Sequence, residues 1–300
     1  MNELRDKLLN RKQTIQDKLI SKLIESHNNI YEPLKLRIER NKNLKKYHYL
    51  DEPLISVTTT TLNRGKMFEE RALDSVLSQT YKNFEYIIIG DCCTDDTSER
   101  IRKINDKRIK FFNLPYRKKR YPYKGNYVAN HWFVGSSFGA NKALEKISGD
   151  WIARIDDWAI WTKNNLEIMV KKSKENKEIE FFSGSTLYKN QKTKGIMALS
   201  EYFKLNKEKI KNTDAMIGPT QTFFYRSYLK FFKYSLNCWR KSVNKTQDFD
   251  LVTRMFSAGV RFGWVDEVMA IIKPRPGLSS VNSQGFLESL TKNKNHFDFK

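Results

Sequence analysis

The chain has 300 residues, with 55 Lys and Arg against 34 Asp and Glu, so its formal net charge is +21 at pH 7. A charge of this sign favours contact with polyanions such as nucleic acid, acidic lipid or anionic glycan, without identifying which. No apolar run approaches the ~18–20 residues of a membrane-spanning helix, and a polar segment follows Met1 where a secretory leader would be apolar. Three cysteines exclude a disulfide framework and a zinc site of paired cysteines. We therefore expect a globular protein of the cytoplasm.

Residues 1–50 form a basic segment whose apolar positions follow a helical spacing, which predicts one or two amphipathic helices. These positions are Leu4, Leu8, Ile15, Leu19 and Leu23. Two interpretations stay open. The helical extension either packs on the body of the protein or lies as a peripheral anchor on an anionic membrane, at its inner face, although its apolar side lacks Trp and Phe.

From Leu54 onward, short β-rich runs alternate with helical patterns. We expect strands at Leu54–Thr60, Phe84–Gly90, Arg108–Leu114 and Trp151–Ile155, with helices around Met67–Gln79, Asp95–Ile104 and Ala140–Ile147. This order predicts an α/β fold with a mostly parallel sheet flanked by helices. Because ligands bind beyond the carboxyl ends of such strands, the site residues are sought there.

Polar residues follow three of the predicted strands. The first loop, Thr58 to Arg64, offers hydroxyls and a turn that could hold a base or ribose, or simply begin the next helix. After the second strand, Asp91 could accept an N–H of a nucleobase, whereas Asp95 and Asp96 are interpreted as helix caps.

Asp156 and Asp157 end a strand that the pattern predicts to be buried. Adjacent carboxylates in such a place are costly unless a cation or hydrogen bonds neutralise them. Mg²⁺ or Mn²⁺ takes one or two protein carboxylates together with substrate phosphates, so a metal-bound nucleotide diphosphate would suit this position. A structural capping role is the alternative.

Taken together, four segments resemble glycosyltransferase family 2, whose nucleotide-binding fold is called GT-A. They are residues 55–65 (ISVTTTTLNRG), 72–81 (ALDSVLSQTY), 84–97 (FEYIIIGDCCTDDT) and 141–157 (NKALEKISGDWIARIDD). The first resembles the opening strand and loop of the family, and the last resembles the helix and strand that deliver its acidic metal-site motif. The resemblance covers roughly residues 53–280.

The resemblance implies a donor site at the ends of these strands. It implies nucleobase contact by Asp91, nucleoside contact by the first loop, ribose contact by Asp156, and a metal-bound diphosphate at Asp157 with Mg²⁺ or Mn²⁺ as cofactor. The first-loop residues are Thr59, Thr60, Thr61, Leu62, Asn63 and Arg64. Trp158 stands where the family commonly has a further aspartate, so the metal site rests on fewer carboxylates than expected.

The second half of the chain is expected to hold the catalytic base. Residues 246–254 (TQDFDLVTR) resemble the family segment whose aspartate is the general base, and Asp248 takes that position, next to Gln247 where the family usually has Glu. Lys273 and Arg275 belong to a loop similar to the one that closes on the diphosphate.

The resemblance implies an inverting enzyme that moves a sugar from a nucleoside-diphosphate sugar to a glycan or lipid-linked acceptor in the synthesis of surface polysaccharide or glycoconjugate. Residues 51–165 would form the nucleotide-sugar half, residues 166–280 the acceptor half, and residues 281–300 a C-terminal tail. The alternative is a catalytically silent GT-A-like module that binds anionic glycan or nucleic acid through its basic surface. No recognised nucleic-acid motif accompanies the charge, so no specific nucleic acid is expected.

Overall fold

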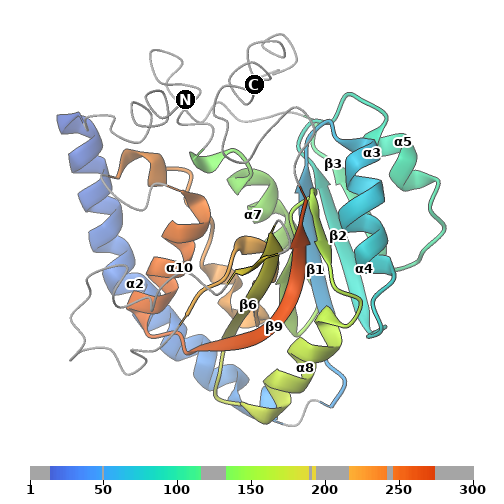
Figure 1. Cartoon of the computed structure of the whole chain (residues 1–300). Coiled ribbons are helices and arrows are strands. Elements are labelled where there is room, and N and C mark those ends of the chain that lie inside the picture. Colours follow the sequence, from blue (N-terminus) through green and yellow to red (C-terminus); the bar gives the residue numbers. More distant parts are fainter. Residues whose placement is uncertain are drawn as a thin grey trace.

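The structure is a computed structural model that describes residues 14–48, 51–115, 133–188, 191–193, 216–241 and 246–273. A single sheet runs through the centre, with the strand order β3-β2-β1-β4-β8-β6-β9-β5 and β7 paired to β6 (Figure 1). Its first half contains β1 (Ile55–Thr61), β2 (Phe84–Gly90), β3 (Ile109–Asn113) and β4 (Trp151–Arg154). These four strands pair in parallel, so their carboxyl ends lie at one edge.

The second half of the sheet has mixed strand directions. Its strands are β5 (Ala159–Trp161), β6 (Phe181–Tyr188), β7 (Gln191–Thr193), β8 (Phe224–Arg226) and β9 (Phe262–Ile272). Strand β8 joins the halves, because it pairs antiparallel with both β4 and β6, while β6 and β9 run parallel. The two predicted halves of the chain therefore share one sheet, and the expected parallel order holds for β1 to β4.

Helices cover both faces of the sheet. The segment after β1 consists of α3 (Gly65–Phe68), a π-helical turn η1 (Glu69–Leu73) and α4 (Asp74–Leu77). The others are α5 (Thr97–Arg102), α7 (Ser137–Lys146), α8 (Asn165–Glu175) and α10 (Gln247–Ala258), with short 3-10 turns η3 (Thr220–Thr222), η4 (Ser227–Phe231) and η5 (Cys238–Arg240).

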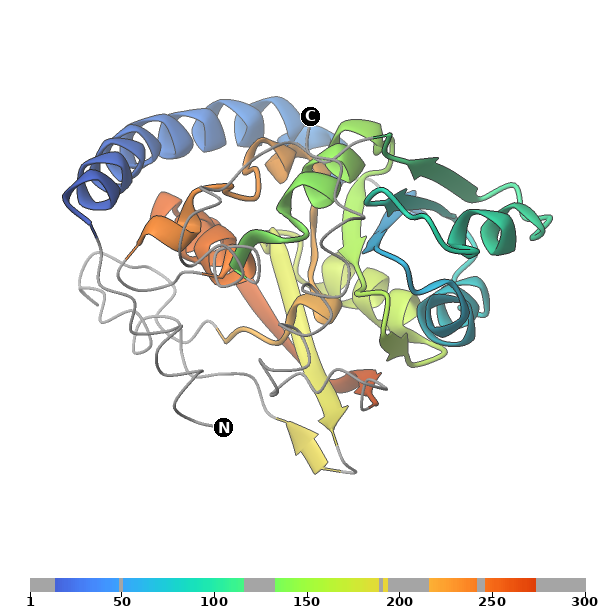
Figure 2. The same cartoon turned by 90° about the horizontal axis from the view of Figure 1, so that it is seen from above.

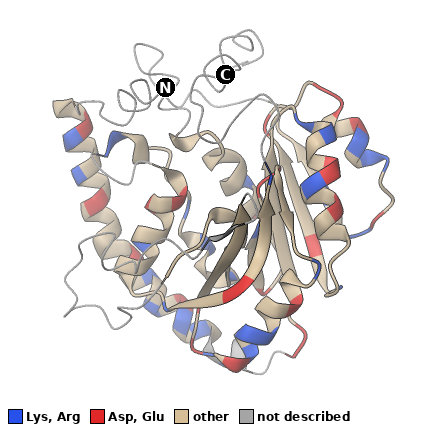
Figure 3. Cartoon of the chain, in the orientation of Figure 1, with Lys and Arg blue, Asp and Glu red and all other residues tan. Residues whose placement is uncertain are grey.

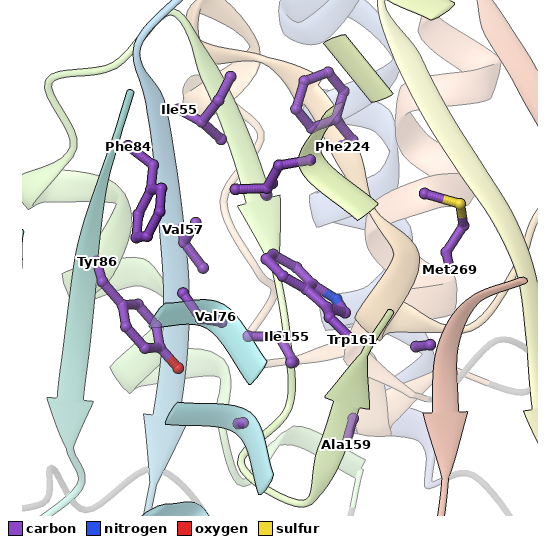
Figure 4. Packing of buried hydrophobic residues seen from close by; sticks show 14 of the residues in the cluster. Ile55, Val57, Val76, Phe84, Tyr86, Ile155, Ala159, Trp161, Phe224 and Met269 are labelled. Atoms are coloured by element: carbon purple, nitrogen blue, oxygen red, sulfur yellow. The ribbon is translucent and has the colours of Figure 1, made fainter. Parts of the chain in front are cut away.

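The apolar core divides into two large clusters on opposite faces of the sheet. In β2, Tyr86 and Ile88 belong to the cluster beneath the α3–α4 segment and α8, whereas Ile87 and Ile89 belong to the cluster beneath α7 and α10. This alternation follows from the period of two in a strand. Figure 4 shows the first cluster, in which Tyr86 lies near Val57 of β1, and Trp161 lies near Ile155, the residue after β4.

The described part of the N-terminal segment is one long helix, α2 (Ile15–His48), with Pro33 inside it. It packs against α10 and lies along the outside of the molecule (Figure 2). Within the described ranges, no helix combines the length and apolar character needed to cross a bilayer.

Candidate functional site

The three loops that follow β1, β2 and β4 meet at one edge of the sheet. The backbone N–H of Asp91 donates to the carbonyl of Thr61 at 2.8 Å, and that of Ile155 donates to the carbonyl of Thr58 at 3.2 Å. These bonds place the first loop between the other two. The polar residues that the sequence assigns to separate strand ends are therefore brought together.

Side chains fix the first loop to the second. Asn63 has a left-handed backbone with φ of 49°, and its Oδ1 accepts the N–H of Thr94 at 2.8 Å. Asp95 accepts the N–H of Gly65 at 3.2 Å through one oxygen and the N–H of Thr97 at 3.1 Å through the other. Asp95 thus holds the first residue of α3 and the first residue of α5, whereas Asp96, the N-cap residue of α5, makes no side-chain capping bond and accepts from Arg100.

The carboxylate of Asp157 is buried and already has partners. Thr61 donates to Oδ2 through Oγ1 at 3.0 Å, and Nη1 of Arg64 lies 3.0 Å from Oδ1. A cation from the first loop therefore neutralises the residue that the sequence assigns to the metal. The neighbouring Asp156 is only half-buried, with 25% of its side chain exposed.

Arg154, at the end of β4, is a buried guanidinium that faces carboxylates from both halves of the chain. Its Nη2 lies 3.7 Å from Oδ1 of Asp156 and donates to Oγ of Ser136 at 3.3 Å. The guanidinium also stacks 4.9 Å from the ring centroid of Tyr234. Burial opposes its charge, but interactions with Tyr234, Asp156, Tyr225 and Asp248 raise the pKa of Arg154 above its ordinary value. Asp156, which follows β4, lies close to this guanidinium, and Asp248, in α10, makes a smaller electrostatic contribution to its pKa.

Asp248 lies in the first turn of α10, where the helix dipole favours a negative charge. Oγ1 of Thr220, in η3, donates to its Oδ2 at 3.0 Å. The adjacent Gln247 accepts from Oγ of Ser137 at 2.7 Å and donates to Oγ of Ser136. The start of α10 is thus anchored to the start of α7, beside Arg154.

The remaining predicted nucleotide residues differ in exposure. The hydroxyl of Thr59 is buried and bonds to the hydroxyl of Tyr86 and the carbonyl of Ile155, both at 2.9 Å. Asp91 is also buried, while Thr60 and Leu62 are half-buried. In the first loop, Thr59 and Thr61 are therefore buried. Thr60 and the residues from Leu62 to Arg64 are partly exposed to solvent.

The end of β9 carries the predicted diphosphate contacts. Lys273 is exposed, and its carbonyl accepts a hydrogen bond from Nη1 of Arg71 at 3.5 Å. Arg275 lies outside the described residues. The same Arg71 donates to the carbonyl of Trp158 at 3.3 Å, and the side chain of Trp158 packs, partly buried, against the first apolar cluster.

The donor groups at this edge include few carboxylates for a divalent ion. Among the described residues, no group of three or more His, Cys, Asp and Glu side chains is placed to hold a metal. The half-exposed Asp156 and the Arg64-paired Asp157 remain as carboxylates. Such a donor set suits an ion that arrives with a diphosphate, since Mg²⁺ and Mn²⁺ accept one or two carboxylates when phosphates supply other ligands.

Sequence reasoning missed Arg154, Thr220 and the serines at the start of α7. The sequence could have indicated Arg154, because a charged residue in the apolar strand WIAR requires a nearby anion or an aromatic partner. Thr220, Ser136 and Ser137 carried none, since hydroxyl residues are common in loops.

Comparison with known proteins places this arrangement in context. The sequence model described as "Glycosyl transferase family 2" matches residues 56–236. The chain is 28% identical over 136 residues to the UDP-Glc:alpha-D-GlcNAc-diphosphoundecaprenol beta-1,3-glucosyltransferase WfgD of Escherichia coli, covering 45% of this chain and 47% of WfgD. It is 25% identical over 265 residues to an uncharacterized glycosyltransferase of Methanocaldococcus jannaschii, covering 83% of each. The match to WfgD thus spans about half of that relative's length.

Solved structures share the fold. The crystal structure of S. aureus TarS in complex with UDP-GlcNAc superposes with a TM-score of 0.53 at 18% identity, covering 82% of this chain and 68% of that one. The mannosyltransferase PcManGT from Pyrobaculum calidifontis, in complex with GDP-Man and Mn²⁺, gives a TM-score of 0.52 at 14% identity, covering 91% of this chain and 72% of that one. At these identities the likeness establishes the GT-A-like fold.

Proposed function

Because the chain belongs to glycosyltransferase family 2, we propose that it transfers a sugar from a nucleoside-diphosphate sugar to an acceptor hydroxyl with inversion at the anomeric carbon. The observation that carries the proposal is the buried Arg154, which lies 3.7 Å from Asp156 and bonds to Oγ of Ser136, as does Gln247, the neighbour of Asp248. On this proposal, Asp156 belongs to the donor half, Asp248 belongs to the acceptor half, and the two form one site. Sugar transfer requires that the donor sugar and the acceptor hydroxyl bind next to each other in one site.

The donor nucleotide is proposed to lie over the loops after β1 and β2. Thr60, Leu62 and Asn63 would contact the nucleoside, with Asp91 at the nucleobase and Asp156 at the ribose. Thr59 and Thr61 support this loop from below, since both hydroxyls bond within the protein. Arg64 is held by Asp157 at 3.0 Å and would present its remaining N–H groups to the diphosphate.

A divalent ion, Mg²⁺ or Mn²⁺, is proposed to accompany the diphosphate, with Asp157 as its protein carboxylate. When bound, the ion would supply positive charge to the departing nucleoside diphosphate. Lys273 and Arg275 are proposed to add positive charge to the diphosphate. The Mn²⁺ complex of PcManGT supports a divalent cation in this fold.

Asp248 is proposed as the general base. The bond from Thr220 to Oδ2 orients the carboxylate, so Oδ1 can accept the proton of the acceptor hydroxyl. The acceptor oxygen then forms a bond to the anomeric carbon as the bond from that carbon to the diphosphate breaks. With base and leaving group on opposite faces of the sugar, this single displacement inverts the configuration.

The acceptor is proposed to be a glycan or a lipid-linked sugar used in the synthesis of surface polysaccharide or glycoconjugate. Support comes from WfgD, whose name gives a sugar on diphosphoundecaprenol as acceptor. UDP-GlcNAc in TarS and GDP-Man in PcManGT are two nucleotide-sugar classes to test as donors.

Thermal stabilisation tests the donor site. Purified protein is heated with UDP, GDP, CDP or dTDP, each with and without Mn²⁺. A ligand at a hundred times its dissociation constant stabilises by about 2.7 kcal/mol, so one nucleotide should raise the melting temperature clearly, and more so with Mn²⁺. No response to any of the four would favour the catalytically silent module, with its basic surface binding anionic glycan or nucleic acid.

A further inference from the structure

The outer face of α2 is an exposed apolar stripe. Of the eight large hydrophobic side chains exposed in the described residues, all but Phe112 lie on this helix, so the exposure is concentrated there. They are Ile15, Leu19, Leu23, Ile30, Tyr31, Leu34 and Ile38, with exposed fractions from 45% to 79%. Spacings of three and four residues put them on one side of the helix. At 1.5 Å per residue, the stripe is about 35 Å long.

The inner face of α2 attaches the helix to the body through ion pairs and through Leu36, which is buried in the second apolar cluster. Asp17 bonds to Arg240 at 2.6 Å, and the buried Glu32 bonds to Arg254. Glu25 lies 3.5 Å from Lys241. At the other end of the helix, Arg40 donates to Glu180 at 2.7 Å and 2.6 Å. Seven large apolar side chains of α2 thus face outward while its ion-paired residues and Leu36 face the body, whereas an ordinary surface helix turns its apolar side to the core.

The ion pairs that attach α2 also use its acidic side chains and leave several of its basic side chains without an ion pair in the described part of the chain. Three of its four acidic residues pair with cations of the body, and the fourth, Glu39, pairs with Lys35 at 2.9 Å on the same helix. Lys and Arg recur along the helix (Figure 3). Those that are exposed and have no ion pair within the described part of the chain are Lys18, Lys22, Arg37, Lys42 and Lys45. The outward side therefore combines apolar side chains with uncompensated positive charge.

We propose that the outer face of α2 binds the surface of an anionic phospholipid bilayer, with the helix lying in the plane of the membrane. Apolar side chains would enter the boundary between headgroups and acyl chains, and the flanking lysines would contact lipid phosphates. Both components are needed, because apolar insertion and attraction to anionic lipid add in interfacial helices.

Instead of a membrane, the apolar stripe of α2 could bind the same stripe on a second copy of the chain. Two α2 helices placed face to face would bring Lys18, Lys22 and Arg37 of each copy close to those of the other, with no free acidic side chain of α2 to compensate them. Like charges in such positions oppose association. The charge of α2 therefore favours a lipid surface over self-association.

Co-sedimentation of the full chain with vesicles tests the proposal without donor or acceptor, so its outcome is separate from that of sugar transfer. The vesicles are phosphatidylcholine alone or phosphatidylcholine with phosphatidylglycerol. The protein should bind the anionic vesicles and should be released by high salt. Replacing Leu23→Gln together with Leu34→Gln should weaken binding by at least about tenfold, since two large side chains no longer enter the membrane.

Matched variants distinguish binding through this surface from binding through the net charge of the protein or through any exposed apolar side chain. Lys18→Gln with Lys22→Gln should weaken binding by about fivefold for each lysine removed. Lys66→Gln with Lys171→Gln removes the same charge from exposed positions on other helices, and Phe112→Gln removes an exposed apolar side chain from β3. Both controls should bind like the unmodified chain. Melting curves establish that every variant is folded.

Two outcomes would overturn the proposal. One is equal weakening by the control and the α2 variants, which would assign binding to the overall charge. The other is a dimer in light scattering without vesicles that the Leu23→Gln, Leu34→Gln variant dissociates, which would make the stripe an interface between copies.

Discussion

The hydroxyl of Thr220 donates to Oδ2 of Asp248 at 3.0 Å, linking η3 to the first turn of α10. The two residues come from different elements, so the bond sets the position of α10 relative to the loop before β8. It also fixes one carboxylate oxygen and thereby the direction of the other. On the proposed mechanism, this bond decides whether the base points at the acceptor.

Replacing Asp248→Asn should lower kcat by ~10²–10⁴-fold, the usual contribution of a general base. Asparagine keeps the shape and can still accept from Thr220, but it cannot take a proton. Nucleotide binding, measured by thermal stabilisation, should be nearly unchanged, because the loss is confined to the transition state. Retained turnover would remove Asp248 from the mechanism.

Thr220 is predicted to act as a positioning residue. Thr220→Val keeps its shape but removes the hydrogen bond, so kcat should fall by roughly tenfold or more while the donor KM stays similar. Thr220→Ser restores a hydroxyl and should recover most of the activity. Equal loss in both variants would show that the packing of the threonine methyl, and not the bond to Asp248, is what matters.

Arg64 should limit metal binding by the nucleotide-free protein. Because its guanidinium neutralises Asp157, the unmodified chain should bind Mn²⁺ weakly in calorimetric titration. Arg64→Gln should tighten Mn²⁺ binding by roughly tenfold, since a nearby positive charge is removed. The control Arg100→Gln removes an equal charge from α5, where it pairs with Asp96 and Glu69, and should not change the affinity.

Metal and nucleotide should each strengthen binding of the other by the same factor, as linkage requires. Tight Mn²⁺ binding by the unmodified, nucleotide-free protein would contradict the account of a carboxylate-poor site that is filled together with the diphosphate.

Trp158 is predicted to support the core, because its side chain packs against the first apolar cluster. Trp158→Asp should lower the free energy of unfolding by about 1–3 kcal/mol for a partly buried aromatic residue. It should not tighten Mn²⁺ binding. Trp158→Phe keeps much of the packing and should melt close to the unmodified chain. A stable Trp158→Asp variant with stronger Mn²⁺ binding would instead place this side chain in the metal site.

Local patterns were enough to predict the first half of the fold. The alternation of apolar and polar runs located β2 at Phe84–Gly90, and β1, β3 and β4 within one or two residues at each end. The second half was harder, because β8 lies between β4 and β6 through antiparallel pairs that depend on distant chain segments. The π-helical turn Glu69–Leu73 was also missed, because a helical apolar period does not distinguish a π-turn from an α-helix.

The sequence predicted where the candidate site lies, at the ends of the parallel strands. It did not predict which side chains of the site interact with one another. Parallel order alone brings the loops of Thr61, Asp91 and Asp157 to one edge. The pairing of Arg64 with Asp157 joins residues 93 positions apart, so only the folded chain reveals it. Likewise, the apolar spacing in the N-terminal segment predicted an amphipathic helix, while the buried Arg254, which draws Glu32 inward, determined which side faces the body.

Glu180 should make the fold sensitive to acid. This buried carboxylate accepts hydrogen bonds from Arg40 of α2, from the hydroxyl of Tyr228 and from the backbone of Arg261. Burial alone would raise the pKa of Glu180, but these bonds together hold it below the ordinary value of 4.5. The unfolded chain therefore binds the proton first, and the stabilisation, complete above about pH 5, is lost as the pH falls through the lower pKa of the folded state.

The variant Glu180→Gln should therefore differ from the unmodified chain in two ways. At pH 7 its free energy of unfolding should be about 3–5 kcal/mol lower, because Arg40 then lacks its buried partner. Between about pH 5 and pH 3 its melting temperature should fall less steeply, because the titrating group is gone. Glu99→Gln, which removes an exposed carboxylate paired with Lys103, should keep the steep acid dependence. If the two variants gave the same pH profile, the acid sensitivity would belong to carboxylates other than Glu180.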